Sequence, residues 1–472
     1  MAGTGVVVGS GPNGLAAACV LAAAGVRVTV LEAADTVGGG TRSSEAIAPG
    51  LLHDHCSAFH PMAVGSPLLG SLDLERLGLR WLLPEIDCVH PLDGGGGAAL
   101  HRSIELTAQE LGADGSRWRL AFGAGAAGFD RLAEDITGPL LRVPKHPLLL
   151  ARFGAGALLP GSVHARLFAE EPARALFAGV AAHGFRPLHL PLSSAIGAGI
   201  ITAGHRHGWP VAEGGSQAIS TALAARLTEL GGEIETGVRV RRAAELPPAD
   251  VTVFDLAPGA VAEILDDRLP SRVARAYRSF RHGPGAFKVD FAVQEGVPWS
   301  NPQARRAGTV HLGGTHAEVA DALRQVTAGR MPDEPFVLVG QQYLADPKRS
   351  VGDVHPLWTY AHVPNGYQGD ATEAIIARIE RYAPGFRDRI LGMAVRTTTE
   401  FAAYNPNYVG GDINGGAGTL LQTVLRPTPR WNPYRTAIPG VYLCSSSTPP
   451  GGGVHGMCGQ NAAQVALADH FS

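Results

Sequence analysis

Three glycines near the start of the chain have the spacing of a turn that holds a phosphate. Gly9, Gly11 and Gly14 form Gly-x-Gly-x-x-Gly, and Glu32 follows 18 positions after the last of them. Glycine permits a tight turn and a close approach to a pyrophosphate, while a carboxylate can bond both hydroxyls of a ribose. The pattern therefore predicts a dinucleotide site. A carboxylate would repel a 2′-phosphate, so we expect FAD or NAD and not NADP.

The segments around this motif are those that position such a site. Residues 4–8 are predicted to form a short buried strand, 15–24 an apolar helix and 26–31 a second buried strand. This β-α-β order places the unpaired N–H groups of the helix N-terminus beside the phosphates. Further members of the expected cofactor site lie in the same stretch and are Pro12, Asn13 and Ala33.

A second glycine-rich segment favours FAD over NAD. It follows Glu32 closely and contributes Gly39, Gly40, Thr41 and Arg42 to the expected cofactor site. Nothing in an NAD dehydrogenase requires another glycine-rich turn at this place. An arginine there can neutralise the charge of a pyrophosphate.

The C-terminal region carries a third glycine-rich turn. Ser446 precedes it, and Gly453, Val454 and His455 lead into a helix predicted from about Met457. The N-terminus of that helix can stabilise the negative charge of a reduced flavin. A site divided between the two ends of the chain is natural for FAD and hard to explain for NAD.

Composition excludes several classes of function. The chain has 472 residues, of which 45% are hydrophobic and 17% charged, which predicts a large core and two domains. A net charge of −3 gives no attraction to nucleic acid. No run reaches the ~20 apolar residues that a membrane span needs. The first strand begins almost at the N-terminus and leaves no room for a signal peptide, so a cytoplasmic protein is expected.

Cysteine and histidine spacing predicts neither a metal site nor a disulfide framework. The five cysteines are widely scattered, and two of them, Cys444 and Cys458, lie in a predicted strand and helix. We therefore expect FAD to be held without a covalent bond. His53, His55 and His60 crowd into one stretch, but they do not share one face of a regular element.

The order of predicted elements gives an α/β fold. We expect a discontinuous Rossmann-type cofactor domain and an α+β substrate domain, which combines an antiparallel sheet with a helical insertion. The cofactor domain is predicted to comprise residues 1–92, 209–285 and 413–472. The helical insertion is predicted at 93–208 and the sheet at 286–412.

The glycine-rich motifs resemble those of the phytoene desaturase-like FAD-dependent oxidoreductases, in the broad amine-oxidase superfamily. They are GSGPNG at 9–14, GGGTR at 38–42, YAHVPNG at 360–366 and YLCSSSTPPGGGVHGM at 442–457. The resemblance covers the whole chain, and the motifs at the two ends are the specific ones. It is closer to the subgroup that includes pyridine nucleotide-disulfide oxidoreductase domain-containing protein 2.

This resemblance implies roles for individual residues. The residues that would hold the ADP part of FAD are Gly9, Gly11, Gly14, Glu32 and Arg42. Val238 would meet the adenine through its backbone, and residues 453–455 would lie at the pyrimidine edge of the flavin.

It also implies a dehydrogenase, desaturase or oxidase that moves hydride from an apolar or amphipathic small molecule to flavin N5. Two alternatives keep the same cofactor site. One is a FAD-binding protein without catalysis that acts through a partner, and the other is a flavin-dependent isomerase or saturase. Homodimers, or peripheral contact with a membrane surface, follow from the same resemblance.

One segment departs from the family pattern. Residues 54–58, Asp-His-Cys-Ser-Ala, stand where the family often has Asp-x-Gly-Pro-Thr. This polar set disfavours a carotenoid-like hydrocarbon as substrate. If the reaction uses a protein base, His55, His60 and His455 are the candidates, because imidazole takes up a proton near neutral pH. The alternative for each is a structural role, such as a turn at His60, which precedes Pro61.

Overall fold

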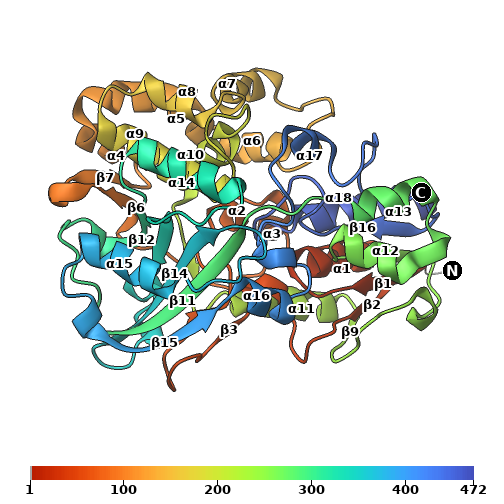
Figure 1. The fold of residues 1–472 in the computed structure, drawn as a ribbon. Helices are drawn as coiled ribbons and strands as arrows, with labels where there is room; N and C mark the ends of the chain where they lie inside the picture. The colour runs from red at the N-terminus through yellow and green to blue at the C-terminus, as the bar shows by residue number, and fades with distance from the viewer. Residues whose placement is uncertain (1–2, 472) are drawn as a thin grey trace.

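Two β-sheets and a group of helices make up the protein, as a computed structural model shows for residues 3–471 (Figure 1). The five-stranded sheet and the seven-stranded sheet lie side by side, and helices α4 to α10 stand above the larger sheet in the view of Figure 1. The two ends of the chain meet beside the smaller sheet, where Gly3 contacts the ring of Phe471.

The smaller sheet is parallel and has the strand order β16-β10-β1-β2-β9. Its strands come from three distant stretches of the chain and are β1 (Thr4–Val8), β2 (Arg27–Leu31), β9 (Glu233–Glu235), β10 (Val251–Phe254) and β16 (Val441–Leu443). A parallel sheet assembled in this way confirms the predicted discontinuous Rossmann-type fold.

Helices cover both faces of this parallel sheet. On one face of the sheet, Val7 of β1 packs against three helices. On the other face, Val6 and Val8 pack against two further helices. Successive residues of a strand point to opposite faces, so this strand is buried on both sides. The helices of the first face are α1 (Pro12–Ala23), α11 (Gln217–Glu229) and α18 (Met457–His470), and those of the second are α12 (Pro258–Leu265) and α13 (Ser271–Arg278).

The larger sheet has the strand order β15-β11-β14-β13-β12-β6-β7. Its members are β6 (Ile86–Pro91), β7 (Gly97–Leu100), β11 (Gly285–Gln294), β12 (Ala307–Leu312), β13 (Val337–Gly340), β14 (Val354–Val363) and β15 (Ile390–Arg396). Neighbouring strands are antiparallel except β12 and β6, which are parallel, so the sheet is mixed and not purely antiparallel.

The position of β6 differs from the sequence-based division of the chain. Residues 1–92 are predicted to belong to the cofactor domain, but β6 pairs with β12 and β7 in the larger sheet. All six residues of β6 are buried. A strand buried on both faces has no polar alternation that could indicate which sheet it joins.

The predicted helical insertion at 93–208 contains seven α-helices, but it also contains β7, which belongs to the larger sheet. Prolines help to divide it: Pro147 starts α7, Pro160 precedes α8, and Pro172 lies in the first turn of α9, where a missing N–H costs nothing. The helices are α4 (Ile104–Glu110), α5 (Gly115–Ala127), α6 (Phe129–Ile136), α7 (Pro147–Ala157), α8 (Gly161–His164), α9 (Glu171–Ala181) and α10 (Ser194–His207).

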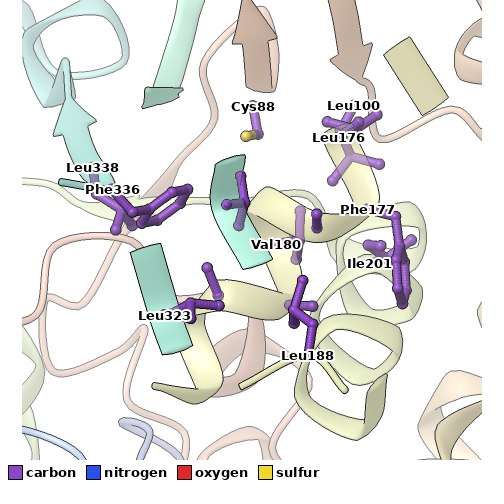
Figure 2. Packing of buried hydrophobic residues seen from close by; sticks show 14 of the residues in the cluster. Cys88, Leu100, Leu176, Phe177, Val180, Leu188, Ile201, Leu323, Phe336 and Leu338 are labelled. Carbon is purple, nitrogen blue, oxygen red and sulfur yellow. The ribbon is translucent and has the colours of Figure 1, made fainter. Parts of the chain in front are cut away.

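One apolar cluster joins this helical part to the larger sheet (Figure 2). Leu176, Phe177 and Val180 of α9 lie between Cys88 on the sheet and Ile201 on α10. Because α9 is buried along nearly its whole length, it fixes the loop that follows it relative to the sheet.

The remaining elements complete the layers. α14 (His316–Thr327) packs with α9 on one face of the larger sheet, and α15 (Thr372–Tyr382) covers the other face. Two short ribbons pair β3 (Ser43–Ser44) with β4 (His53–Asp54) and β5 (Trp81–Leu82) with β8 (Val211–Ala212). The other short helices are α2 (Pro61–Val64), α3 (Pro67–Ser71), α16 (Thr398–Tyr404) and α17 (Leu420–Leu425).

Candidate functional site

A cavity of about 1130 Å³ is lined by both sheets and by the helical part of the chain. Its wall includes the turn after β1, the C-terminal glycine-rich turn and residues of β12, β13, β14, α7 and α10. Every residue that the sequence assigns to the cofactor site lines this cavity except Gly14. The fold therefore brings together motifs from the two ends of the chain.

The turn between β1 and α1 has the geometry of a phosphate-binding turn. Gly9 has a φ of +101°, and Gly11 is the N-cap of α1, which begins at Pro12. A Cβ on Gly14 would stand 2.1 Å from the carbonyl oxygen of Gly9, so only glycine fits there. Gly14 thus acts through helix–strand packing, which explains why it does not reach the cavity itself.

Glu32 is buried at the carboxyl end of β2, where its side chain is fixed by the same turn. Its Oε2 accepts hydrogen bonds from Ser10 N–H at 2.9 Å and from the Ser10 hydroxyl at 2.5 Å, and its Oε1 accepts from Ala34 N–H at 2.8 Å. Val238 N–H donates to the carbonyl of Glu32 at 2.8 Å, which places Val238 at this edge of the sheet. The carboxylate, Ala33 and Val238 all line the cavity.

The segment at 38–42 folds against the turn after β1. Gly38 N–H donates to the carbonyl of Ser10 at 3.0 Å, and Arg42 Nη2 lies 3.4 Å from Glu32 Oε1. Arg42 also donates to the carbonyl of Thr36 at 2.6 Å, and its guanidinium lies over the ring of Tyr404 at 5.6 Å. The arginine is therefore held at the cavity wall by neighbours and keeps a positive charge close to the glycine turn.

Asp255 belongs to this end of the cavity, although we do not predict it from the sequence. It follows β10, lines the cavity, and its Oδ2 accepts a hydrogen bond from Gly14 N–H at 2.9 Å. Burial, together with the nearby carboxylate of Glu32, raises the pKa of Asp255 to about 7. A signal for it exists: it directly follows β10, which is parallel to β1, and the carboxyl ends of such strands form the nucleotide edge.

The C-terminal turn reaches the cavity because α18 packs directly on α1. A Cβ on Gly459 would stand 1.9 Å from the carbonyl oxygen of Asn13, so the two helix backbones touch. His455 Nδ1 accepts a hydrogen bond from Met457 N–H at 3.1 Å, and its carbonyl accepts from Ser66 Oγ at 2.6 Å. Cys444 and Cys458 are buried beside this turn.

The three histidines proposed as bases have different surroundings. His60 and His455 line the cavity, and His55 does not. Burial lowers the pKa of His60 and of His455 to about 4 and that of His55 to about 3. His60 Nε2 lies 2.9 Å from Ser216 Oγ, and His55 Nε2 lies 2.7 Å from Ser44 Oγ. All three are neutral at pH 7 and can only accept protons transiently.

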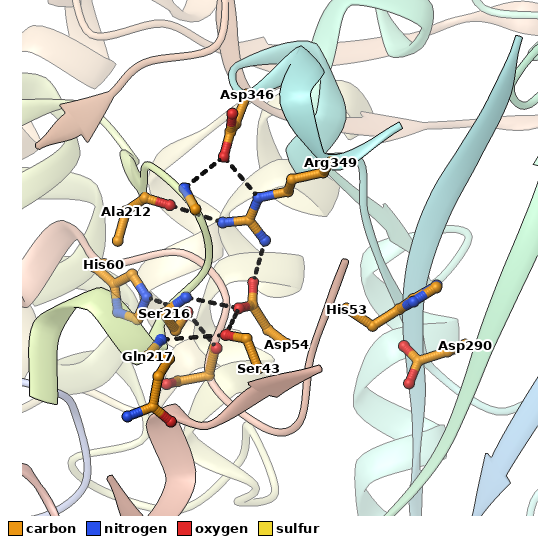
Figure 3. Close-up of polar contacts among 12 residues, drawn as sticks. Ser43, His53, Asp54, His60, Ala212, Ser216, Gln217, Asp290, Asp346 and Arg349 are labelled. Carbon is orange, nitrogen blue, oxygen red and sulfur yellow. Dashed lines mark hydrogen bonds and ion pairs between the residues drawn. The ribbon is translucent and has the colours of Figure 1, made fainter. Parts of the chain in front are cut away.

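Most of the polar residues near His60 have structural partners (Figure 3). Asp54 is fully buried and forms an ion pair with Arg349 at 2.6 Å, and its Oδ1 accepts from Ser216 N–H at 2.7 Å. Arg349 also contacts Asp346 at 3.2 Å. This network ties the ribbon of β3 and β4 to the start of α11. Among residues 3–471, no group of three or more His, Cys, Asp or Glu is arranged to hold a metal ion.

Two aromatic residues of β14 form the floor of the cavity on the larger sheet. Trp358 and Tyr360 line it together with Leu338 of β13 and Thr309 of β12. Beneath them, the buried Lys288 forms an ion pair with Asp290, and its Nζ lies 6.0 Å from the ring centroid of Trp358. Burial lowers the pKa of Lys288.

A pair of histidines lies at the edge of this floor. His183, after α9, lines the cavity, and its Nε2 lies 3.0 Å from Nε2 of His311 on β12. His311 Nδ1 in turn lies 3.5 Å from the thiol of Cys88. Burial lowers the pKa of His183 to about 4. The sequence gives no sign of this pair, because its members are separated by 128 positions.

The cavity continues into an apolar chamber beneath the helical part. The residues of this chamber are Leu140, Leu150, Phe153, Ala157, Leu158, Leu192 and Ile196. Leu140, Leu158 and Ile196 are also exposed on the outer surface, so the chamber opens there. Val143 and Leu148, which lie close to Leu140 and Leu150 in the sequence but outside the cavity lining, are 91% and 88% exposed. Over residues 3–471, no single helix could cross a membrane by length and composition, although the bent pair Pro147–Ala157 and Gly161–Leu167 passes that test jointly.

The fold and the glycine-rich turns define a dinucleotide-binding protein of the Rossmann type. Residues 7–68 match the model of the NAD(P)-binding Rossmann-like domain. Over nearly its whole length the chain is also similar, at low identity, to proteins named as oxidoreductases or desaturases. It is 25% identical to mouse (Mus musculus) pyridine nucleotide-disulfide oxidoreductase domain-containing protein 2, over 98% of this chain and 93% of that protein. It is 27% identical to hydroxyneurosporene desaturase of Cereibacter sphaeroides, over 98% of this chain and 97% of that protein.

A solved structure supports the same fold. Putrescine oxidase, solved with putrescine bound, superposes with a TM-score of 0.61 at 19% identity, and the match covers 99% of each chain. The combination of a Rossmann-like sheet with a mixed, mostly antiparallel sheet is therefore shared with an amine oxidase.

Proposed function

We propose that the protein is a FAD-dependent oxidoreductase that takes hydride from an apolar or amphipathic small molecule. One observation carries the proposal: a single cavity connects the dinucleotide turn, the C-terminal glycine-rich turn and an apolar chamber. An NAD dehydrogenase needs the first of these turns, but it gives no reason for a second turn from the other end of the chain.

The residues at the cavity wall fit FAD. A Cβ on Gly11 would stand 2.7 Å from Asp255 Oδ2, so glycine is needed for the turn to lie against Asp255, and Gly11 itself lines the cavity. Asn13 Oδ1 is buried and lacks a hydrogen-bond partner among the described residues, and Asn13 lines the cavity. A polar atom in this position can be satisfied by a bound cofactor.

When bound, FAD supplies the acceptor for hydride. The residues of this chain bind and orient the cofactor and the substrate, and they exclude water from the cavity. The glycine turn and the N-terminus of α1 hold the phosphates, and Glu32 orients the ribose. The N-terminus of α18 favours negative charge beside residues 453–455. Trp358 and Tyr360 position the substrate against an apolar wall.

Proton transfer, where the reaction needs it, has a neutral acceptor in the cavity wall. His183 is uncharged at pH 7 because burial lowers its pKa, and its Nε2 is engaged with His311. His183 is therefore added to His60 and His455 as a candidate base.

The apolar chamber supports an apolar or amphipathic substrate. Leu140 and Leu158 of the chamber are exposed, as are Val143 and Leu148 in the same stretch of the sequence, and we propose that substrate enters from a membrane surface. Residues 139–168 include Arg142, Lys145, Arg152 and Arg166 and contain no Asp or Glu. This charge suits anionic lipid headgroups.

The test is an absorbance spectrum of the purified protein before and after acid precipitation. Bands of oxidised flavin that pass into the supernatant are expected and would identify non-covalent FAD. A protein that stays colourless after addition of FAD, yet binds NAD, would overturn the proposal.

A panel of apolar amines, alcohols and hydrocarbons then separates the alternatives. Anaerobic bleaching of the flavin by one of them is expected for a dehydrogenase or oxidase. Chemistry that requires a reduced flavin from the start would indicate an isomerase or saturase. No response in either state would favour a FAD-binding protein that acts through a partner.

A further inference from the structure

An arginine at the edge of the apolar chamber has no counter-charge. Arg186 lines the cavity and is only 6% exposed. Among residues 3–471, no carboxylate lies within ion-pair distance of its guanidinium. Its hydrogen bond is donated by Nη1 to Thr423 Oγ1 at 3.2 Å, and its buried Nε has no partner. A buried positive charge normally has an anionic partner, because the loss of its hydration is costly.

One carboxylate, Asp412, acts on a second arginine of the cavity, Arg426, and raises its pKa, but no carboxylate acts in this way on Arg186. Arg426, which also lines the cavity, donates to the carbonyl oxygens of Gln422 at 3.1 Å and Ser446 at 3.3 Å and forms no ion pair within the described chain. Burial lowers the pKa of both arginines. The carboxylates that line the cavity are Glu32, Asp255 and Glu263, all in the cofactor domain.

This corner lies beside the C-terminal turn and not beside the phosphate turn. Asn414 Nδ2 donates to the carbonyl of His183 at 3.1 Å, and a Cβ on Gly452 would stand 3.0 Å from the carbonyl oxygen of Asn414. The pyrophosphate has its own partners in the turn after β1 and in Arg42. The guanidinium of Arg186 is thus available to a ligand that occupies the apolar chamber.

We propose that the substrate carries a carboxylate, which binds Arg186 while its apolar body fills the chamber lined by Phe153, Leu158 and Ile196. The substrate class is then an apolar monocarboxylate, and this inference rests on the proposed oxidoreductase function. A carboxylate fits because its two oxygens match the planar fork of a guanidinium. Its single charge balances one arginine, and the neighbouring His183 is neutral.

The test compares ligands that differ only in charge. The full-length protein is titrated by calorimetry with dodecanoate, dodecanol and dodecylamine, each below its micelle concentration. Dodecanoate is expected to bind at least tenfold more tightly than dodecanol, and dodecylamine more weakly than either. Equal affinity for dodecanoate and dodecanol would overturn the proposal, and this comparison needs no variant.

Variants then locate the carboxylate. Arg186→Gln is expected to abolish the preference for dodecanoate, and Arg186→Lys to retain part of it. Arg324→Gln removes an exposed, ion-paired arginine outside the cavity lining and is the matched control, with the full preference expected. A preference that persists in Arg186→Gln would overturn the assignment.

Flavin content and thermal stability are measured on the same samples. A protein that carries FAD but shows no preference for dodecanoate would contradict this inference alone. A protein that prefers dodecanoate but takes up no FAD would contradict the proposed function and leave the carboxylate site standing.

Discussion

The two ends of the cavity are built in different ways. The cofactor end consists of backbone: glycines of the turn after β1, the N-terminus of α1 and the C-terminal turn. The chamber end consists of side chains from α7, α10, the loop after α9 and α17. At the cofactor end, backbone segments approach one another so closely that a Cβ does not fit between them. At the chamber end, the binding properties depend on which side chains face the cavity.

This difference teaches where each kind of change should act. A backbone site has little tolerance, because a single added methyl group meets a carbonyl oxygen. A side-chain site can change its chemistry without changing the fold, since loops and helix surfaces tolerate substitution. Substitutions of the glycines at the cofactor end should therefore affect folding and flavin together, and those at the chamber should affect ligand choice alone.

The largest effect is expected for Gly14→Val. The new side chain would meet the carbonyl oxygen of Gly9, 2.1 Å from the position of Cβ, and force α1 away from β1. Overpacking of this kind costs about 1–3 kcal/mol, and the loss of the turn should abolish flavin retention. Chemical denaturation and the flavin-to-protein ratio measure the two consequences.

Gly259→Ala is the matched control for this substitution. Gly259 lies in α12, and a Cβ there has no neighbour within 4 Å. Alanine in a helix is expected to raise stability by up to about 1 kcal/mol and to leave flavin unchanged. Equal stability of the Gly14→Val and Gly259→Ala proteins would show that the turn after β1 is not as tight as the structure has it.

Glu32→Arg should act on flavin more than on folding. The substitution removes the carboxylate that accepts from Ser10 and Ala34 and that is expected to bond the ribose. Binding of FAD is expected to weaken by about a hundredfold or more, in line with the loss of two charge-assisted hydrogen bonds. Titration of the apoprotein with FAD measures the change in affinity. Glu32→Gln is the milder control. Unchanged flavin occupancy would show that the adenosine lies elsewhere.

Asp255→Asn should change how stability depends on pH. The pKa of Asp255 is about 7 in the folded protein, above the ordinary value of an unfolded aspartate, so the folded state binds the extra proton between about pH 4 and 7. Stability is then lost as pH rises through this window, by about 1.4 kcal/mol per pH unit at most, and stays low above it.

The asparagine variant is therefore expected to be more stable than the parent at pH 8 and equally stable at pH 4. Its amide oxygen can still accept from Gly14 N–H. The charged neighbour that bears on the titration is Glu32, whose carboxylate raises the pKa of Asp255. Melting temperatures of both proteins, measured across this pH range, test the prediction. If the two melting temperatures change with pH in the same way, Asp255 is ionised throughout the range.

The same contrast explains what the sequence could predict. The cofactor end follows from short-range spacing, since Gly9 to Glu32 form one β-α-β unit and residues 446–455 precede one helix. Both motifs could be placed in a fold because each contains its own strand or helix. Asp255 was within reach of the same rule, since it directly follows a strand next to β1.

The chamber end could not be predicted because its members share no local pattern. His183 and His311 come from the helical part and from β12, and Arg186 meets Thr423 across 237 positions. The polar stretch 53–60 shows a mixed outcome. Asp54 is bound to Arg349 and His55 lies outside the cavity lining, whereas residues 56–60, with His60 among them, line the cavity.

The smallest effect on the fold, and a sharp test of the chamber, is expected for Leu148→Ser. Leu148 is 88% exposed at the start of α7, whose later residues line the chamber, so stability should change by less than about 0.5 kcal/mol. If this surface contacts lipid, binding to vesicles of phosphatidylglycerol and phosphatidylcholine should weaken about threefold, because one apolar side chain no longer enters the membrane.

Leu391→Ser on β15 is the control, since that leucine is also exposed but belongs to a strand that does not line the cavity. Sedimentation with vesicles at low and high salt separates the electrostatic contribution to membrane binding from the hydrophobic contribution. Added salt should weaken binding through the basic residues of 139–168, whereas the loss from Leu148→Ser should persist at every salt concentration. Equal effects of the two serine variants would mean that the exposed leucines of this stretch are ordinary surface, and that substrate enters the chamber from water.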